Sequence, residues 1–513
     1  MAFLAAIEVD QRQKLITSTD KLKEMLGGSW TIEAMPEVVK PLLDKAAREG
    51  DLQVITSLSG ELWLRSTDLA HLEKTVWSLR EALVNEEQLP CSFAIVEEAE
   101  DAAVKDIRGI LEAEVKRIKD GKTGEMAFSA LPWFAPCLIQ PDQFANQWYP
   151  KQVSKRRDLL SDASSRRSAV GDQALSHYRD LLPDCGYANF ANDLDDFQCG
   201  DENSFIGIIR LDADRSGSIF RESDWKSWEQ MTAASNALVR CLDESLRKAI
   251  LDSVPSAPRI SDVFPISPLI RAGEDFLIVS RRDVAIPLTL QLMENYEKAA
   301  NDDEDLKCVR NSTRLTLSGS ILFARRAFPF SVLDELSRDL EHSAKEFRKS
   351  IQGDSQGCVD VYWLDSSARE DPIDQRNKSS RYAYGGALHH RFSSPWTLGQ
   401  LKAIWNAVNL LAKAKEGARI PRGKWHEILG TLRFGAPVSQ FAWRVWRSGL
   451  NDDQRKLIDN VSEGLKEVGL WPTDEAQAPW IRKMFVQENA FVTVLYDLHR
   501  ALEAITGIDE LEQ

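Results

Sequence analysis

Long hydrophobic runs are missing from this 513-residue sequence. No stretch approaches the roughly 20 consecutive apolar residues that are needed to cross a bilayer. The N-terminal segment MAFLAAIEVDQRQK has neither a basic lead nor a cleavage-like site, which argues against a secretory signal peptide. We therefore expect a cytoplasmic protein without a membrane partner, in which the first apolar segment is a buried strand.

Cysteine patterns that mark metal or disulfide frameworks are also missing. The seven cysteines are scattered along the chain and no CxxC pair occurs. Neither a zinc ribbon nor a disulfide framework is indicated, although Cys185 and Cys199 could form half of a metal site. Reduced thiols in a cytosolic protein are the simpler interpretation.

The sequence lacks an excess of positive charge. It has 64 Lys and Arg against 79 Asp and Glu, which gives a formal net charge of −15. This balance argues against a protein that binds nucleic acid by bulk electrostatics. Residues 151–167 (KQVSKRRDLLSDASSRR) could form a local basic groove, but a solvated linker is the simpler interpretation of such a charge run. The length predicts two to four domains.

The sequence does contain an internal duplication, in which three elements occur twice in the same order. Residues 3–16 and 205–220 are apolar strands that each end in an acid-x-acid pair, Glu8 and Asp10 in the first copy and Asp212 and Asp214 in the second. Residues 54–66 and 268–280 each read as a hairpin with a glycine at its tip. The third element is a strand followed by an amphipathic helix, at residues 91–121 and again at 314–347.

This repeated order of elements predicts an α+β fold. We expect two ferredoxin-like palm domains, similar to nucleotide cyclases, in which the first strand lies antiparallel to the hairpin. The expected divisions are a first palm at 1–130, a linker or helical insert at 131–202, and a second palm with the AGEDF motif at 203–394. A helical C-terminal domain should follow at 395–513, where Trp443 and Trp446 could stack bases but more often would lie in the core.

The acidic residues of the second copy predict a metal site. Asp212 ends one strand and Glu274 lies on the adjacent hairpin, so strand pairing should bring their carboxylates together. Carboxylates that close raise one another's pKa, and Mg²⁺, which prefers one or two carboxylates plus substrate phosphates, would relieve the conflict. Such ions can activate a 3′-hydroxyl and neutralise a leaving pyrophosphate. Asp214 and Asp275 are the second acids of the two pairs. The alternative is that both motifs are ordinary surface turns.

Glycine and lysine side chains complete the predicted site. Gly273 would let the backbone approach a nucleotide closely. Lys345 and Lys349 lie one helical turn apart, which suits a polyphosphate but also a solvated helix end. The first copy reads SGEL, with Leu62 in place of the second acid. We expect the first palm to contribute nucleotide contacts without catalysing.

The motifs LDAD and AGEDF resemble those of GGDEF diguanylate cyclases and, more closely, the GGDD palm of the large subunit of type III CRISPR effector complexes. The segment QKLITSTDKLKEMLGGS resembles the part of that subunit's first palm where a helix leads into a Gly-Ser loop. The segment LTLSGSILFARRAFPFSVLDELSRDLEHSAKE resembles the strand and the helix, ending in Ala-Lys, of its second palm. The similarity spans most of the chain.

This resemblance implies that ATP is converted into cyclic oligoadenylates in a pocket between the palms, with Mg²⁺ or Mn²⁺. It also implies other CRISPR-type effector subunits and guide and target RNA as partners. By the matching motifs, Asp212 and Glu274 would hold the metals, with Asp275 beside them. Lys345 would contact phosphate, and Gly28 and Ser29 would line the first palm's half of the pocket.

Two alternatives to an enzyme that makes cyclic oligoadenylates remain open. The GGDD motif is AGEDF here, and a catalytically inactive subunit that binds nucleotide or bridges other proteins and guide RNA would also fit the sequence. A diguanylate-cyclase-like enzyme is a third interpretation, although the duplicated palm and the helical tail count against it. The sequence starts directly with the first palm and contains no His-Asp dipeptide, so we expect the family's nuclease domain to be absent.

Overall fold

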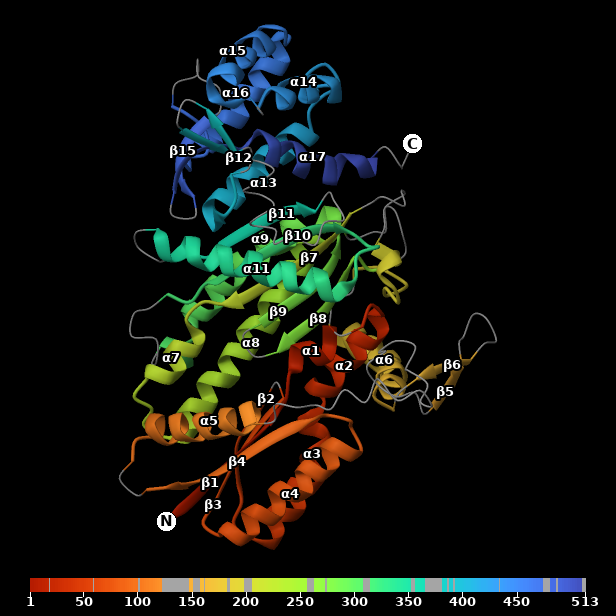
Figure 1. The fold of residues 1–513 in the computed structure, drawn as a ribbon, viewed down its shortest axis with the longest axis vertical. Helices are drawn as coiled ribbons and strands as arrows, with labels where there is room; N and C mark the ends of the chain where they lie inside the picture. Colours follow the sequence, from red (N-terminus) through yellow and green to blue (C-terminus); the bar gives the residue numbers. More distant parts are fainter. Residues whose placement is uncertain are drawn as a thin grey trace.

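Three regions follow one another along the long axis of the molecule (Figure 1). The computed structural model describes residues 1–17, 19–58, 60–99, 102–121, 147–150, 157–160, 162–181, 185–197, 205–255, 263–272, 275–307, 314–351, 356–364, 381–384, 387–390, 393–432, 434–473, 480–485 and 488–509. The first palm lies at one end, the second palm in the middle, and a helix-rich region at the other end. No helix within these residues is both long enough and apolar enough to cross a membrane.

The first palm is a four-stranded antiparallel sheet with helices. Its strands are β1 (Ala2–Val9), β2 (Gln53–Leu58), β3 (Glu61–Ser66) and β4 (Cys91–Glu98), in the order β2-β3-β1-β4. Its helices are α1 (Arg12–Thr17), α2 (Leu22–Glu33), α3 (Met35–Glu49), α4 (Leu69–Asn85) and α5 (Val104–Gly121). This strand order is the ferredoxin-like one that the repeat predicted.

The second palm repeats that order and extends it. Its six-stranded sheet runs β14-β11-β10-β7-β9-β8. The strands are β7 (Phe205–Ala213), β8 (Ile266–Ala272), β9 (Asp275–Arg281), β10 (Leu317–Arg325), β11 (Cys358–Leu364) and β14 (Trp396–Thr397). The helices are α7 (Ser216–Glu222), α8 (Trp228–Ser253), α9 (Arg282–Asp302), α10 (Glu304–Lys307) and α11 (Phe330–Ser350). The part β8-β9-β7-β10 corresponds to β2-β3-β1-β4, so the internal repeat is confirmed.

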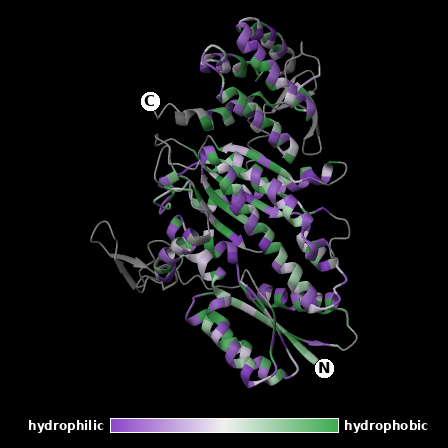
Figure 2. Ribbon diagram, turned by 180° about the vertical axis from the view of Figure 1, so that it is seen from behind, coloured by the Kyte–Doolittle hydropathy of each residue, from purple (hydrophilic) through white to green (hydrophobic). Residues whose placement is uncertain are grey.

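Helices cover both faces of the second sheet, and alternate residues of β7 point to opposite faces. A Cβ on Gly207 would lie 2.7 Å from Cβ of Ala285, so α9 packs closely on one face. Arg210 donates to Ser337 Oγ of α11 at 3.2 Å on the other face. A strand covered on both sides is expected to be almost continuously apolar, and the strands of this sheet are largely hydrophobic (Figure 2). Because Asp212 lies two residues after Arg210, it faces α11.

The segment between the palms contacts both of them: its long helix packs on the first palm, whereas Phe190 contacts Phe264 and Asp195 pairs with Arg326 in the second. It contains β5 (Gln147–Pro150), β6 (Arg157–Leu160), α6 (Asp162–Leu181) and a short 3₁₀ helix at Leu194–Phe197. Arg166 at the end of the basic run pairs with Glu87, and the buried Arg167 donates to the carbonyl of Leu15 at 2.6 Å. These two arginines therefore hold α6 in place, and neither is part of a solvated linker or an open groove.

The C-terminal region is mainly helical, as expected. Its helices are α13 (Leu398–Ala412), α14 (Arg422–Leu432), α15 (Gly435–Ser448), α16 (Asp452–Glu467) and α17 (Leu495–Asp509). Trp443 and Trp446 are each 2% exposed, and their rings stack with centroids 5.0 Å apart, which confirms their role in the core.

A small sheet was not predicted in this region. It has the order β12-β13-β16-β15, from β12 (Arg381–Tyr384), β13 (Ala387–His390), β15 (Trp480–Phe485) and β16 (Glu488–Thr493). Strand β13 lies in residues assigned to the second palm from the sequence, yet it pairs in parallel with β16. Pairing between segments so far apart in the chain leaves no local signal in the sequence.

Among the described residues, four cysteines are buried and not joined in disulfide bonds: Cys91, Cys185, Cys241 and Cys358. Cys199, the predicted partner of Cys185 in a half metal site, lies outside the described residues.

Candidate functional site

Strand pairing brings two aspartates face to face in the second palm. Asp212 at the end of β7 is directly opposite Asp275, the first residue of β9. Residues opposite one another in an antiparallel pair have their side chains on the same face, roughly 5 Å apart at Cβ. Glu274, the predicted partner of Asp212, lies with Gly273 outside the described residues. The described acid that meets Asp212 is therefore Asp275.

The environment of Asp212 strongly favours its protonated form. Burial, followed by the hydrogen bond with Asp275 and its charge, raises the pKa of Asp212 to about 9, while Lys345 opposes this shift. The Asp212 side chain is only 16% exposed, so little solvent screens the repulsion. Asp212 therefore keeps its proton at neutral pH in the metal-free protein and shares a hydrogen bond with Asp275. A divalent cation would replace that proton, and two carboxylates on one sheet face are a donor set that Mg²⁺ or Mn²⁺ fits.

Lys345 is the counter-charge of this pair. It lies on α11, pairs with Asp212, and its Nζ is 2.5 Å from Glu341 Oε1. Burial lowers the pKa of Lys345, but the charges of Asp212 and Glu341 outweigh burial and raise it. The ammonium group thus lies beside the acids, at the place where sequence reasoning expected a phosphate contact.

Asp214, which was expected to be a metal ligand, is bound instead by two hydroxyl groups and an arginine. Its Oδ2 accepts hydrogen bonds from Thr316 and Ser318, both at 2.6 Å, and its Oδ1 is 3.2 Å from Nε of Arg348. Burial raises the pKa of Asp214 although Arg348 and the two hydroxyl groups oppose the shift. Because Asp214 lies just beyond the end of β7, it meets α11 one turn after Lys345. It belongs to a buried network that ties α11 to the sheet.

A cavity of about 620 Å³ opens between the two palms beside Asp275. Gln13 of α1 reaches across it from the first palm, and its Nε2 donates to Asp275 Oδ2 at 3.3 Å. Asp212 is not part of the cavity wall and lies opposite Asp275 on the neighbouring strand. Other wall residues come from both palms: Ser29, Ile32, Thr56, Trp63, Phe220, Met231, Ser235, Leu238 and Ile270.

Positive charges in this cavity come from residues that sequence reasoning missed. Arg12 and Lys14 of α1 and Arg338 of α11 line the cavity. Arg12 pairs with Glu61 at 2.9 Å and Arg338 with Asp334 at 2.5 Å. Lys14 is exposed, and no described acid pairs with it. The available signal was position, because Arg12 and Lys14 directly follow the acid-x-acid pair of the first repeat.

Three predicted nucleotide contacts have mixed outcomes in the structure. Ser29 lines the cavity, but Gly28 faces Arg167 and Leu15 instead. Both lie inside α2 and not in a Gly-Ser loop, because α6 crosses α2 so closely that a Cβ on Gly27 would be 2.0 Å from the carbonyl oxygen of Arg167. Lys349 is exposed and pairs with Glu346 at 2.8 Å, away from the acids.

The first palm contains a second pair of facing acids. Glu8 of β1 is opposite Glu61 of β3, in the register that places Asp212 opposite Asp275. Lys119 of α5 lies 2.5 Å from Glu8, as Lys345 of α11 pairs with Asp212. Burial raises the pKa of Glu61, which Arg12 opposes. Glu61, and not the buried Leu62, therefore corresponds to Asp275, because each hairpin has two residues between its paired ends and only the position of the glycine differs by one.

Comparison with known proteins supports the interpretation of the palms. Residues 205–351 match the family model described as Cas10/Cmr2, second palm domain. No curated protein matches the chain significantly.

Among solved structures, the Csm1–Csm4 subcomplex of the type III-A CRISPR-Csm interference complex is similar over 100% of this chain and 70% of that one, with 14% identity and a TM-score of 0.54. The Csm1–Csm4 cassette in complex with pppApA is similar over 100% and 69%, with 12% identity and a TM-score of 0.51. The same cassette in complex with cA3 gives 100% and 69%, 12% identity and a TM-score of 0.50. At such low identity these likenesses show a common fold. The chain is therefore a Cas10-like protein with palm domains, in which residues 205–351 form a second palm domain of the Cas10/Cmr2 type.

Proposed function

We propose that this protein is a divalent-metal-dependent nucleotidyl transferase that makes cyclic oligonucleotides from ATP in the cavity between its palms. The observation that carries the proposal is the facing pair Asp212 and Asp275, with Asp275 in the cavity wall. Two carboxylates this close repel one another in the metal-free protein, and Mg²⁺ or Mn²⁺ would relieve that repulsion.

Each cavity residue has a role in this proposal. Asp212 and Asp275 hold the cation, which when bound lowers the pKa of the attacking 3′-hydroxyl and neutralises the leaving pyrophosphate. Gln13 orients the carboxylate of Asp275 through its hydrogen bond. In the free protein, the positive charge of Lys345 balances the acids. Once a bound cation balances them instead, the flexible side chain of Lys345 can turn to a phosphate. Glu274, Gly273 and Ser29 remain proposed site residues from the sequence.

Phosphate groups have cationic partners in the cavity wall. Lys14, Arg12 and Arg338 line the same cavity as Asp275 and come from both palms. A triphosphate bound there would contact the first palm through α1 and the second palm through α11. A nucleotide that bridges the two palms in this way would explain why the active acids need the first palm beside them.

The similar structures support adenine nucleotides as the substrate class. The Csm1–Csm4 cassettes that share this fold were solved with pppApA and with cA3. Both ligands are built from adenosine units, so ATP is the proposed substrate here. The type III-A interference complex that contains Csm1–Csm4 likewise supports other effector subunits, with guide and target RNA, as proposed partners.

An inactive subunit is the second candidate function, and the ion pairs favour it. Asp212 already pairs with Lys345, and Asp214 with Arg348. Because protein cations already balance Asp212 and Asp214, the site could bind nucleotide, or bridge other subunits, without turnover.

Product analysis separates the two candidates. Purified protein with ATP and Mg²⁺ or Mn²⁺, assayed alone and with its partner subunits and target RNA, should release pyrophosphate and form cyclic oligoadenylates. The variant Asp275→Asn should lose both products, whereas Glu8→Gln, in the facing pair of acids of the first palm, should keep them. If the protein forms no product under any of these conditions, the inactive-subunit interpretation is correct.

A further inference from the structure

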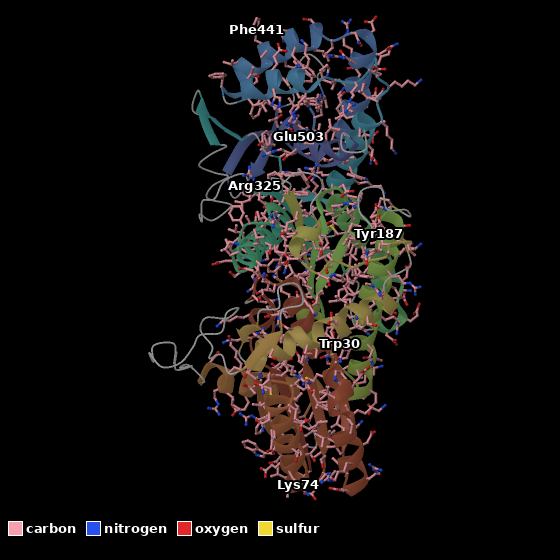
Figure 3. All side chains as sticks on the ribbon, turned by 90° about the vertical axis from the view of Figure 1, so that its right-hand side faces the viewer. Trp30, Lys74, Tyr187, Arg325, Phe441 and Glu503 are labelled. Atoms are coloured by element: carbon pink, nitrogen blue, oxygen red, sulfur yellow. The ribbon has the colours of Figure 1, made fainter. Side chains whose placement is uncertain are left out.

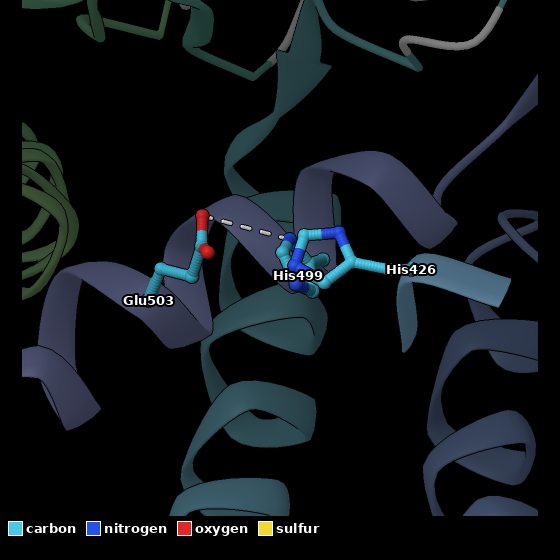
Figure 4. Close-up of side chains that lie close together, drawn as sticks. All are labelled: His426, His499 and Glu503. Atoms are coloured by element: carbon cyan, nitrogen blue, oxygen red, sulfur yellow. Dashed lines mark ion pairs between the residues drawn. The ribbon is translucent and has the colours of Figure 1, made fainter. Parts of the chain in front are cut away.

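A cluster of two histidines and one glutamate lies in the C-terminal region, away from the cavity between the palms. His499 and Glu503 are on α17, and His426 is on α14 (Figure 4). One possible ligand atom from each residue lies within 4.8 Å of the other two. Nδ1 of His499 is 3.6 Å from Oε2 of Glu503, and the two imidazole rings have centroids 5.3 Å apart. None of the three residues lines the cavity that contains Asp275.

The spacing of these residues suits an ion with tetrahedral coordination. His499 and Glu503 are four residues apart and therefore share one face of α17. Zinc bonds of about 2.0–2.2 Å at tetrahedral angles put ligand atoms roughly 3.3–3.5 Å apart. The 3.6 Å between His499 and Glu503 is close to that separation. His426 is exposed, so its ring can close the remaining gap by side-chain rotation.

The surroundings also favour a bound cation. His499 is 5% exposed, and burial lowers its pKa to about 4, so the ring is a neutral ligand at physiological pH. Arg422 lies 3.0 Å from Oε1 of Glu503, which fixes the carboxylate and leaves Oε2 directed at His499. A hydrogen bond to the second oxygen of a ligating carboxylate is typical of metal sites.

Two positive charges oppose a cation here, that of Arg422, which pairs with Oε1 of Glu503, and that of Arg500. Nη1 of Arg500 is 3.6 Å from Oε2 of Glu503. Its guanidinium group is held elsewhere, because it lies 5.5–5.9 Å from the ring centroids of Phe205, Trp363 and Tyr496. The contact of Arg500 with Oε2 is therefore longer than a hydrogen bond, and an ion within bonding distance of Oε2 would outweigh it.

We propose that His426, His499 and Glu503 form a transition-metal site, with Zn²⁺ as the ion that suits two imidazoles and one carboxylate best. Three protein ligands leave a fourth position for water. The ion would join α14 to α17, and α17 reaches the second palm through Arg500 and the start of β7 at Phe205. The site would thus strengthen the contact between the C-terminal region and the sheet that holds Asp212. Glu503 lies on the part of this region nearest the second palm, whereas Phe441 lies at its far end (Figure 3).

Metal content and Co²⁺ spectra test this proposal with untagged full-length protein. After treatment with a chelator and dialysis against Zn²⁺, the wild-type chain should retain about one more equivalent of zinc than His426→Ala. His426 is exposed, so this variant should fold. His342→Ala is the matched control, because it removes another exposed histidine, on α11, and should retain the wild-type amount.

Co²⁺ identifies the ligands directly. The wild-type protein should give visible bands of a tetrahedral nitrogen and oxygen site that are lost in both His426→Ala and Glu503→Gln. Equal zinc retention by wild type and His426→Ala would overturn the proposal. An intense thiolate charge-transfer band that persists in both variants would overturn it as well, because the ion would then be bound by cysteine.

Discussion

Gln13 of the first palm donates a hydrogen bond to Asp275 of the second palm, 262 positions later in the chain, with 3.3 Å between Nε2 and Oδ2. The amide group fixes one oxygen of the carboxylate that faces Asp212. The catalytic half of the proposed site therefore depends on the first palm for the orientation of one of its acids. This contact explains in physical terms why two palms occur in one chain.

Removal of that amide should reduce turnover without loss of stability. For Gln13→Ala we expect pyrophosphate release to fall about tenfold, since a hydrogen bond to a charged group contributes roughly 1.5 kcal/mol. Gln53→Ala is the matched control, because Gln53 also joins the palms, through Glu229 at 3.1 Å, but lies away from the acids. If the two variants lose activity equally, Gln13 acts only through the contact between the palms.

Thermal stability should depend on pH through Asp212. Its pKa is about 9 in the folded protein against an ordinary value of 3.8, so between these values the folded state binds the extra proton. That contribution to stability is complete below about pH 4 and is lost as the pH rises to 9, by up to roughly 1.4 kcal/mol per pH unit.

Asp212→Asn removes the titrating group, so its melting temperature should fall less than that of the wild type from pH 6 to pH 9. The measurement is differential scanning calorimetry in metal-free buffer. If the melting temperatures of the two proteins fall by the same amount over this pH range, the assignment of the raised pKa to Asp212 is contradicted.

Only one of the two predicted lysines should matter for catalysis. Lys345 pairs with Asp212, whereas Lys349 is exposed and pairs with Glu346. We expect Lys345→Met to weaken kcat/KM for ATP by at least about tenfold, which corresponds to roughly 1.4 kcal/mol. Lys349→Met should remain close to wild type, because exposed ion pairs contribute little. Steady-state kinetics of pyrophosphate release distinguish the two, and the opposite order of effects would refute the role given to Lys345.

The sequence predicted the repeated architecture because each unit carries a local signal. Apolar strands that end in acids, glycine-tipped hairpins and amphipathic helices recur in one order, and the two sheets show the corresponding strand orders. The register at the hairpin tips could not be obtained in this way. Aligning SGEL with AGEDF matches Leu62 to Asp275, but strand pairing matches Glu61 to it. Both tips have two residues, and the glycine is the second of them in the first hairpin but the first in the second, so aligning the glycines shifts the register by one.

The residues that form the wall of the cavity also could not be predicted from the sequence. Gln13, Arg12 and Lys14 belong to the first palm, and nothing local indicates that α1 lies against the acids of a domain 200 positions away. Gly28 was expected in the pocket because its segment resembles the part of the family's first palm where a helix leads into a Gly-Ser loop. In the structure the Gly-Gly pair is helical because it accommodates α6.

Glycines in two helices should respond oppositely to the same substitution. A Cβ on Gly27 would lie 2.0 Å from the backbone oxygen of Arg167, and backbone cannot move aside easily. Gly27→Ala should therefore destabilise the protein by about 1–3 kcal/mol, as overpacking does. Gly109 in α5 has no atom within 4 Å of the corresponding position, so Gly109→Ala should stabilise by about 0.5–1 kcal/mol. Urea unfolding measures both changes, and a neutral Gly27→Ala would contradict the close crossing of α2 and α6.

Binding of Mn²⁺ tests the metal site most directly, because it needs neither an activator nor turnover. Electron paramagnetic resonance of free Mn²⁺, titrated with protein in the presence of a non-hydrolysable ATP analogue, measures the affinity. If Asp212 and Asp275 hold the cation, Asp212→Asn and Asp275→Asn should each weaken Mn²⁺ binding by at least about tenfold, roughly 1.4 kcal/mol, while Glu8→Gln should bind like the wild type. Equal Mn²⁺ affinity in all four proteins would contradict the account.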